Sequence, residues 1–244
     1  MKQIGFSPEI EVKFNIPRSI PFRDVVMRLQ QAFCDNLLSH YRKKGKKEAL
    51  KIAEKESRPN PEIRTYLYYD TPQLDALKNA ETIRQIYCTG RRRPFWVTCK
   101  VASLSEEGLS VLESDSLKFF EEQSATDLRR ELRLTQKYPA LEKVIEAETQ
   151  HLKWLLIPLD VEVKLDLCGN FRELEFELET KENTGSVAKL RRHIEPIVVD
   201  AGFEPTRVLV PKYIRHMYCH HEHKEQVRRV LPDWIVSHLT ELEE

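Results

Sequence analysis

The sequence lacks an excess of charge of either sign, a cysteine framework and any long apolar run. Its 244 residues include 39 Lys and Arg and 39 Asp and Glu, so no global basic field marks it as a general nucleic-acid binder. Its 5 cysteines are scattered and contain no C-x-x-C pair, which argues against a disulfide framework or a zinc ribbon. No apolar run approaches the roughly 18 residues of a membrane span, and no signal-peptide core stands at the N-terminus. We therefore expect a soluble, cytoplasmic protein with reduced thiols and with neither a membrane nor a nucleic-acid partner.

Charged residues are nevertheless abundant, and near the N-terminus they follow the period of a strand. They make up 32% of the chain, above the usual share of about 25%. Glu9, Glu11 and Lys13 alternate with apolar residues, so the charged side chains share one strand face. Two carboxylates about 7 Å apart on a strand, followed by an ammonium group, could hold a divalent cation and an anion bound to it. A half-buried strand with a solvated polar face would show the same pattern.

Further segments show strand-like alternation, and three show helical spacing. Two of the strands predict a strongly acidic hairpin, in which acids alternate with apolar residues on either side of a Cys-Gly-Asn turn. The expected strands cover residues 9–16, 62–70, 81–88, 95–102, 128–134, 160–167 and 173–179. The expected helices cover residues 22–38, 139–156 and 187–201, the last ending at Gly202. Residues 109–120 fit neither pattern.

The strands at 81–88 and 95–102 predict a β-hairpin with a basic tip. If Arg84 and Lys100 are opposite partners on one face, the hairpin is centred on Arg92.

The polar faces of these strands carry acids and bases together, and this decides the predicted fold. Closing about eight strands into a barrel, with the apolar faces outward against the helices, would enclose the charges. Buried like charges need partners, and segregated acids and bases inside one tunnel are what a polyphosphate and its metal ion require. We therefore predict an α+β fold, a closed eight-stranded antiparallel β-barrel with a charged interior and helices packed outside.

Several short motifs follow one another in a particular order along the chain. They are Glu9-x-Glu11-x-Lys13, Tyr69-Asp70-Thr71-Pro72, Arg84, Lys100, Arg129-x-Glu131, Gly169-x-Phe171-x-Glu173-x-Glu175 and Lys212-Tyr213. In this order they resemble the CYTH family, also called the triphosphate tunnel metalloenzymes. The resemblance implies a tunnel enzyme that hydrolyses inorganic tripolyphosphate or an organic triphosphate such as thiamine triphosphate. It also fits family members that make cyclic AMP from ATP, and a non-catalytic module that binds polyphosphate or nucleotide.

By this resemblance, most of the charged motif residues have a role at a triphosphate. The catalytic residues would be Glu9, Glu11 and Lys13. The metal ion, Mg²⁺ or Mn²⁺, would be bound by Glu9, Glu11, Glu173 and Glu175. The triphosphate would be bound by Lys13, Arg84, Lys100, Arg129 and Lys212, together with Arg133, which departs from the family pattern. The partner would be a small-molecule triphosphate or nucleotide, and a monomer and a homodimer both stay open.

Two positions depart from the family pattern. Ile86 stands where the family has the second base of an Arg-x-Arg pair, and Arg133 stands where it has an acid. The first change removes a phosphate-binding base and the second adds one. We expect the two changes to compensate each other; loss of turnover is the alternative.

The predicted domain covers residues 1–220, with a helical insertion at about 41–57 and a C-terminal helical tail at 221–244. The basic insertion could extend the preceding helix or form a helical hairpin broken at Gly45. It could bind a nucleic acid or an acidic membrane, but it lacks interleaved aromatic residues, which favours a solvated helix face. A cluster of histidines could bind zinc, although a solvated helix end is commoner. These histidines are His216, His220, His221 and His223.

Overall fold

A computed structural model describes residues 6–9, 11–88, 96–105, 108–114, 137–156, 161–169, 171–178, 187–219 and 224–239. Its strands are β1 (Phe6–Glu9), β2 (Glu11–Asn15), β3 (Asn60–Asp70), β4 (Glu81–Cys88), β5 (Trp96–Ser105), β6 (Gly108–Ser114), β7 (Glu142–Leu156), β8 (Val161–Cys168) and β9 (Arg172–Leu178). Its helices are α1 (Phe22–Lys43), α2 (Ala49–Glu56), α3 (Asp75–Lys78), α5 (Val187–Asp200), α6 (Lys212–Cys219), α7 (Lys224–Val230) and α8 (Asp233–Val236). The predicted strand at 128–134 lies outside the described residues.

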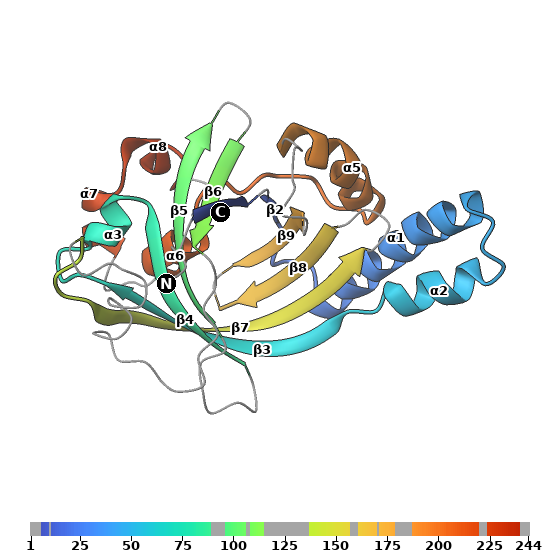
Figure 1. The fold of residues 1–244 in the computed structure, drawn as a ribbon, viewed down its shortest axis with the longest axis horizontal. Coiled ribbons are helices and arrows are strands. Elements are labelled where there is room, and N and C mark those ends of the chain that lie inside the picture. The colour runs from blue at the N-terminus through green and yellow to red at the C-terminus, as the bar shows by residue number, and fades with distance from the viewer. Residues whose placement is uncertain are drawn as a thin grey trace.

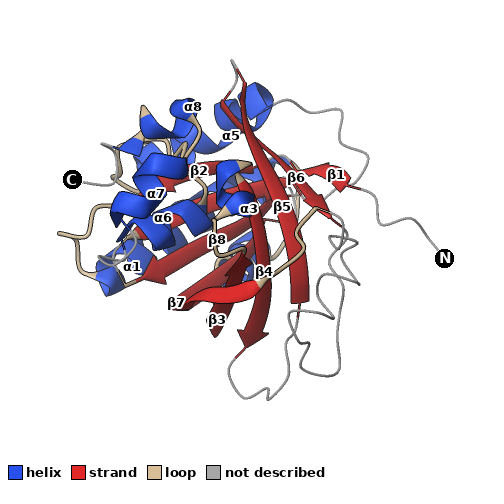
Figure 2. Cartoon of the chain, turned by 90° about the vertical axis from the view of Figure 1, so that its left-hand side faces the viewer, coloured by secondary structure: helices blue, strands red, loops and turns tan. Residues whose placement is uncertain are grey.

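The strands form one antiparallel sheet that curls into a half-barrel (Figure 1). In the described residues its order is β1-β6-β5-β4-β3-β7-β8-β9-β2. The α+β fold with helices outside the sheet is confirmed (Figure 2). The closed eight-stranded barrel is wrong. β1 (residues 6–9) pairs with β6 at one end of the sheet, and β2 (residues 11–15) pairs with β9 at the other end. Among the described residues, no strand pairs with both ends of the sheet, so the barrel is not closed by hydrogen bonds.

The apolar faces of β2, β8 and β9 pack against α1 and α5, as their alternation predicts. Phe14 and Phe176 belong to one buried cluster with Phe33 of α1 and Trp154 of β7. The Phe33 ring lies 5.3 Å from the Trp154 ring and 6.4 Å from the Phe176 ring, both edge to face. Because successive strand residues point to opposite faces, the charged residues of these strands are turned to the concave side.

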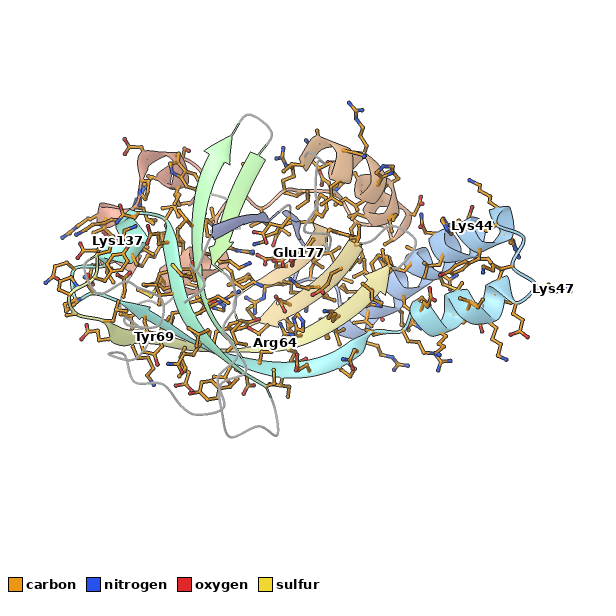
Figure 3. All side chains as sticks on the ribbon, viewed as in Figure 1. Lys44, Lys47, Arg64, Tyr69, Lys137 and Glu177 are labelled. Carbon is orange, nitrogen blue, oxygen red and sulfur yellow. The ribbon has the colours of Figure 1, made fainter. Side chains whose placement is uncertain are left out.

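The helices α1 and α2 form a hairpin at one end of the molecule (Figure 1), which is one of the two arrangements expected for the basic insertion. Gly45 has a φ of 66°, a left-handed conformation that ends the first helix. Residues 42–48 are exposed, and Lys44 and Lys47 lie at the outer tip, away from the sheet (Figure 3). In the part of the chain that the structure describes, no helix is long and apolar enough to cross a membrane.

The helices α3, α6, α7 and α8 lie at the other end of the sheet (Figure 1). They share a second buried cluster, which includes Tyr68 of β3, Leu77 of α3, Met217 of α6, Val227 of α7 and Ile235 of α8. The C-terminal helices therefore pack on the same body as the sheet.

The predicted helix at 139–156 is wrong, because residues 142–156 form the long strand β7 between β3 and β8. Its buried positions include Thr149 and His151, whereas Leu155 is exposed. Two buried polar side chains hide the alternation of the strand, and the apolar residues that remain happen to have helical spacing.

The hairpin of β4 and β5 differs from its predicted register. Arg84 lies opposite Thr98 and Lys100 lies opposite Thr82, so the hairpin is not centred on Arg92. The shift from the predicted pairing is two residues, which keeps every side chain on its face. Arg84 and Lys100 therefore share one face, as the sequence predicts.

Candidate functional site

A cavity of about 60 Å³ lies on the concave side of the sheet and reaches the start of α6. Among the described residues, six cations line it: Lys13, Arg64, Arg84, Lys100, Lys164 and Lys212. Three carboxylates line it with them: Glu11, Asp166 and Glu175. The cavity is therefore strongly cationic, although the whole chain has equal numbers of acidic and basic residues.

Lys13 joins two of these carboxylates. Its Nζ lies 2.7 Å from Glu11 and 3.2 Å from Glu175. Burial lowers the pKa of Lys13, but the neighbouring carboxylates outweigh this effect and raise it above its usual value. Burial likewise raises the pKa of Glu175, yet Lys13 and Lys164 hold it well below its usual range. The ammonium group of Lys13 and the carboxylate of Glu175 therefore stay charged at neutral pH.

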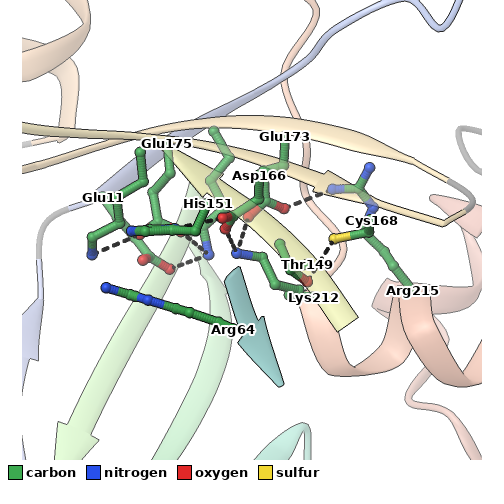
Figure 4. Close-up of polar contacts among 12 residues, drawn as sticks. Glu11, Arg64, Thr149, His151, Asp166, Cys168, Glu173, Glu175, Lys212 and Arg215 are labelled. Atoms are coloured by element: carbon green, nitrogen blue, oxygen red, sulfur yellow. Dashed lines mark hydrogen bonds and ion pairs between the residues drawn. The ribbon is translucent and has the colours of Figure 1, made fainter. Parts of the chain in front are cut away.

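Lys212, the first residue of α6, joins two further acids (Figure 4). Its Nζ contacts Asp166 and lies 3.0 Å from Glu173, which Arg215 contacts at 2.6 Å. Burial raises the pKa of Asp166, but Lys212 and His151 hold it well below its usual range. Buried ion pairs thus fasten α6 to β8 and β9, and removing one partner of such a pair typically costs about 3–5 kcal/mol.

The arginines of β3 and β4 reach the cavity from the opposite wall. Arg84 Nε donates a hydrogen bond to Thr98 Oγ1 at 3.0 Å, and its guanidinium lies 5.2 Å from the Tyr66 ring centroid. Arg64 Nε donates to Glu62 at 2.7 Å. A guanidinium can bind two oxygens of a phosphate at once, so this wall is suited to phosphate recognition.

The structure brings together most of the site residues that the sequence predicts. Those lining the cavity are Glu11, Lys13, Arg84, Lys100, Glu175 and Lys212. Glu173 is fully buried and bonded to α6 through Lys212 and Arg215. The backbone of Glu9 pairs with Val111, while its side chain lies outside the description, as do Arg129 and Arg133 entirely.

Sequence reasoning did not identify Arg64, His151, Lys164, Asp166 and Arg215 as site residues. Lys164 and Asp166 stand on the charged face of the alternating segment 160–167, so the signal for them was present. His151 is hidden by the helical spacing of its strand. Arg64 is followed on the same strand face by Tyr66 and Tyr68, and these aromatic residues give no signal of a charged cavity.

The donor chemistry of the site fits a hard divalent cation. Glu11 and Glu175 approach one ammonium group from two paired strands, and carboxylate oxygens are the ligands that Mg²⁺ and Mn²⁺ prefer. Among the described side chains, no three of His, Cys, Asp or Glu are grouped to hold a metal ion. The side chain of Glu9, the fourth expected ligand, is not among them.

His216 is buried on α6, so the expectation of a solvated histidine is wrong for this residue. Its ring lies 5.5 Å from the ring of Tyr68 and 4.9 Å from that of Phe171. Burial, together with the nearby Lys212 and Arg215, lowers the pKa of His216 to about 3, so it is neutral. The other three histidines of this segment lie outside the described residues.

Comparison with solved structures supports the fold. A candidate adenylyl cyclase from Hippeastrum, reported to have a dominant triphosphatase activity, superposes with a TM-score of 0.57 at 14% identity, over 84% of this chain and 93% of that one. A protein from Pyrococcus horikoshii OT3 superposes with a TM-score of 0.52 at 16% identity, over 81% of this chain and 92% of that one. A candidate adenylate cyclase from Vibrio parahaemolyticus superposes with a TM-score of 0.50 at 11% identity, over 86% of this chain and 97% of that one.

No protein-family model and no curated protein matches the sequence. The structural comparisons nevertheless confirm that the chain has a CYTH-like fold.

Proposed function

We propose that this protein hydrolyses a triphosphate with the help of Mg²⁺ or Mn²⁺, acting on inorganic tripolyphosphate or on an organic triphosphate such as thiamine triphosphate. The observation that carries the proposal is the charge of the cavity, in which six cations face three carboxylates among the residues that the structure describes. Lys and Arg bind phosphate oxygens through charge-assisted hydrogen bonds, and a triphosphate presents several such oxygens in a row. The triphosphatase activity reported for the Hippeastrum neighbour supports the same reaction.

In this proposal the cations exchange carboxylate partners for phosphate oxygens. The bases that would bind the triphosphate are Lys13, Arg64, Arg84, Lys100, Lys164 and Lys212, with Arg129 added by the family resemblance and Arg133 as the compensating base that departs from the family pattern. Glu9, Glu11, Glu173 and Glu175 would hold the metal ion, which supplies charge stabilisation at the transferred phosphoryl group. No protein nucleophile is needed, because water can attack the terminal phosphorus while the cations stabilise the departing diphosphate.

Cyclisation of ATP to cyclic AMP is the second candidate, supported by the description of the Vibrio and Hippeastrum neighbours as candidate cyclases. The same cations would bind the triphosphate, and the ribose 3′-hydroxyl would attack the α-phosphorus. The two reactions differ in their products: hydrolysis releases phosphate, whereas cyclisation releases pyrophosphate and cyclic AMP.

The proposal is tested by incubating the purified protein with tripolyphosphate, thiamine triphosphate and ATP, each with Mg²⁺ or Mn²⁺, and identifying the products. We expect phosphate release that stops when a chelator is added. Cyclic AMP would establish the second candidate. A rise in melting temperature with these compounds, without any product, would identify a binding module and contradict hydrolysis.

Glu11→Gln tests the metal role, because it preserves the size of the side chain and removes one negative charge. We expect activity at low metal concentration to fall at least about 100-fold, as for loss of a direct carboxylate ligand, with partial recovery at high metal. The matched control is Glu204→Gln, at an exposed position. Near-normal activity and metal dependence in the Glu11 variant would remove this residue from the metal site.

A further inference from the structure

His151 occupies a central place in the cavity wall that the proposed reaction leaves without a role. It lies in the middle of β7, opposite Asp166 of β8 on one side and Glu62 of β3 on the other. Its side chain is 1% exposed, and it lines the cavity. Figure 4 shows it among the acids Glu11, Asp166 and Glu175.

The hydrogen bonding of His151 determines which ring nitrogen carries the proton. Nδ1 lies 2.6 Å from Asp166 Oδ1. Lys212 also contacts Asp166, so this carboxylate is ionised and can only accept. Nδ1 is therefore the donor, and in the neutral ring Nε2 has its lone pair available. Nε2 is buried and has no hydrogen-bond partner among the described residues.

Charged groups lie opposite His151 on the neighbouring strands or line the same cavity. They are Glu62 and Arg64 from β3, Lys164 and Asp166 from β8, Lys212 from α6, Glu11 and Lys13 from β2, Glu175 from β9, Arg84 from β4 and Lys100 from β5. Each of these carboxylates contacts a cation: Glu11 and Glu175 contact Lys13, Glu62 contacts Arg64, and Asp166 contacts Lys212. Asp166 contacts both Lys212 and His151, so it fixes the ring and can stabilise a proton that the ring gains.

We propose that His151 is the general base of the proposed triphosphatase, oriented by Asp166. Nε2 accepts one proton from the attacking water as the water oxygen bonds to the terminal phosphorus. The bond from that phosphorus to the bridging oxygen breaks, and the bridging oxygen leaves with the diphosphate. The protonated ring then releases its proton to solvent. This inference rests on the proposed hydrolysis and adds a catalytic residue to it.

The test is His151→Gln, because the amide can still form hydrogen bonds in place of Nε2 but cannot take up a proton near neutral pH. We expect kcat to fall at least about 100-fold with KM changed less than about threefold, since a general base acts in the transition state. The pH profile of kcat should also change, because the group that takes up the proton of the water has been removed. His193→Gln, at an exposed position of α5, is the matched control and should retain both the rate and the profile.

Two other roles give different results. A histidine that only binds phosphate would, when replaced, leave kcat and its pH profile unchanged and raise KM, which would overturn the proposal. A structural histidine would lower the melting temperature and leave the folded fraction with the wild-type pH profile, which would also overturn it.

Chemical rescue keeps the test decisive if the Gln variant is unstable. In His151→Ala, added imidazole should raise the residual rate at least about tenfold. Failure of this rescue in a folded variant would count against a base at this position. A nitrogen-15 NMR spectrum of the wild type should show the proton of the neutral ring on Nδ1. If the wild type hydrolyses the triphosphate and the Gln variant does so equally well, only the role of His151 is overturned. If the wild type binds tripolyphosphate but forms no product, both the proposed hydrolysis and the proposed base are overturned.

Discussion

At Ile86 the concave face of β4 changes from polar to apolar. Arg84, two residues earlier on the same face, lines the cavity, whereas Ile86 is 4% exposed and belongs to the second buried cluster. It lies opposite Tyr66 of β3, whose ring is also below the guanidinium of Arg84. The missing second arginine of the family pattern is therefore replaced by packing among apolar and aromatic side chains.

Ile86→Arg should consequently not repair the site. We expect the variant to lose about 2–4 kcal/mol of unfolding free energy, because the larger, charged side chain would enter a closed apolar cluster. Thermal melts with and without tripolyphosphate measure this, and Ile86→Met, which nearly conserves volume, is the control. A stable variant with tighter triphosphate binding would show that this position opens to the cavity.

Asp70 shows how one acid at the end of β3 fixes two helices. Its Oδ1 accepts hydrogen bonds from the backbone N–H groups of Thr71 at 2.7 Å and Ala76 at 2.8 Å. Its Oδ2 accepts from the Leu77 N–H and from the Tyr213 hydroxyl, both at 3.0 Å. The motif at positions 69–72 therefore has a structural role: it holds α3 and, through Tyr213, the helix that begins with a cavity cation.

Asp70→Asn should weaken both helices, because one acceptor oxygen becomes an NH₂ donor that faces N–H or O–H groups. We expect a loss of about 2–4 kcal/mol, from lost hydrogen bonds to a charged acceptor and a buried unsatisfied donor. KM for the triphosphate should also rise, since Lys212 precedes Tyr213 on α6. The readouts are urea unfolding and steady-state kinetics, with the exposed Asp200→Asn as control. Unchanged stability would mean that other contacts suffice to hold these helices.

The elements that the sequence predicts correctly are those whose two faces differ strongly. In β2, β8 and β9 charged residues alternate with apolar ones, so the strand period is visible without any knowledge of the partners. β7 fails because its concave face carries Thr149 and His151, which read as surface residues until the cavity is known. The helices α6, α7 and α8 pack through contacts between distant parts of the chain, which no local pattern reveals.

At the scale of the whole molecule, the balanced charge of the chain conceals a separation in space. Cations are concentrated around the cavity and at the outer tip of the α1–α2 hairpin, where residues 42–48 are exposed (Figure 3). Total composition could not predict this, because it counts charges without placing them. The periodicity of individual strands could predict part of it, since it placed several of the cations on one face.

The C-terminal helices provide the largest test of how the molecule holds together. The sequence predicts a helical tail at 221–244, and in the described part of this segment Val227, Leu231, Ile235 and Leu239 are buried in the second cluster with α6. Fully burying one such side chain contributes about 1.5–3 kcal/mol, so the four together are comparable to the 5–15 kcal/mol by which a typical domain is stable.

Removing residues 224–244 should therefore unfold the protein or lower its melting temperature by more than about 10 °C. Ile235→Ala separates lost packing from chain shortening, and it should cost about 2–5 kcal/mol because it leaves a cavity in the cluster. The exposed Val199→Ala is the control and should cost little. If the truncated chain melted at the wild-type temperature and still bound tripolyphosphate, the segment would be an appendage, and α6 would have to be held in place by its ion pairs with Asp166 and Glu173 and by the sheet alone.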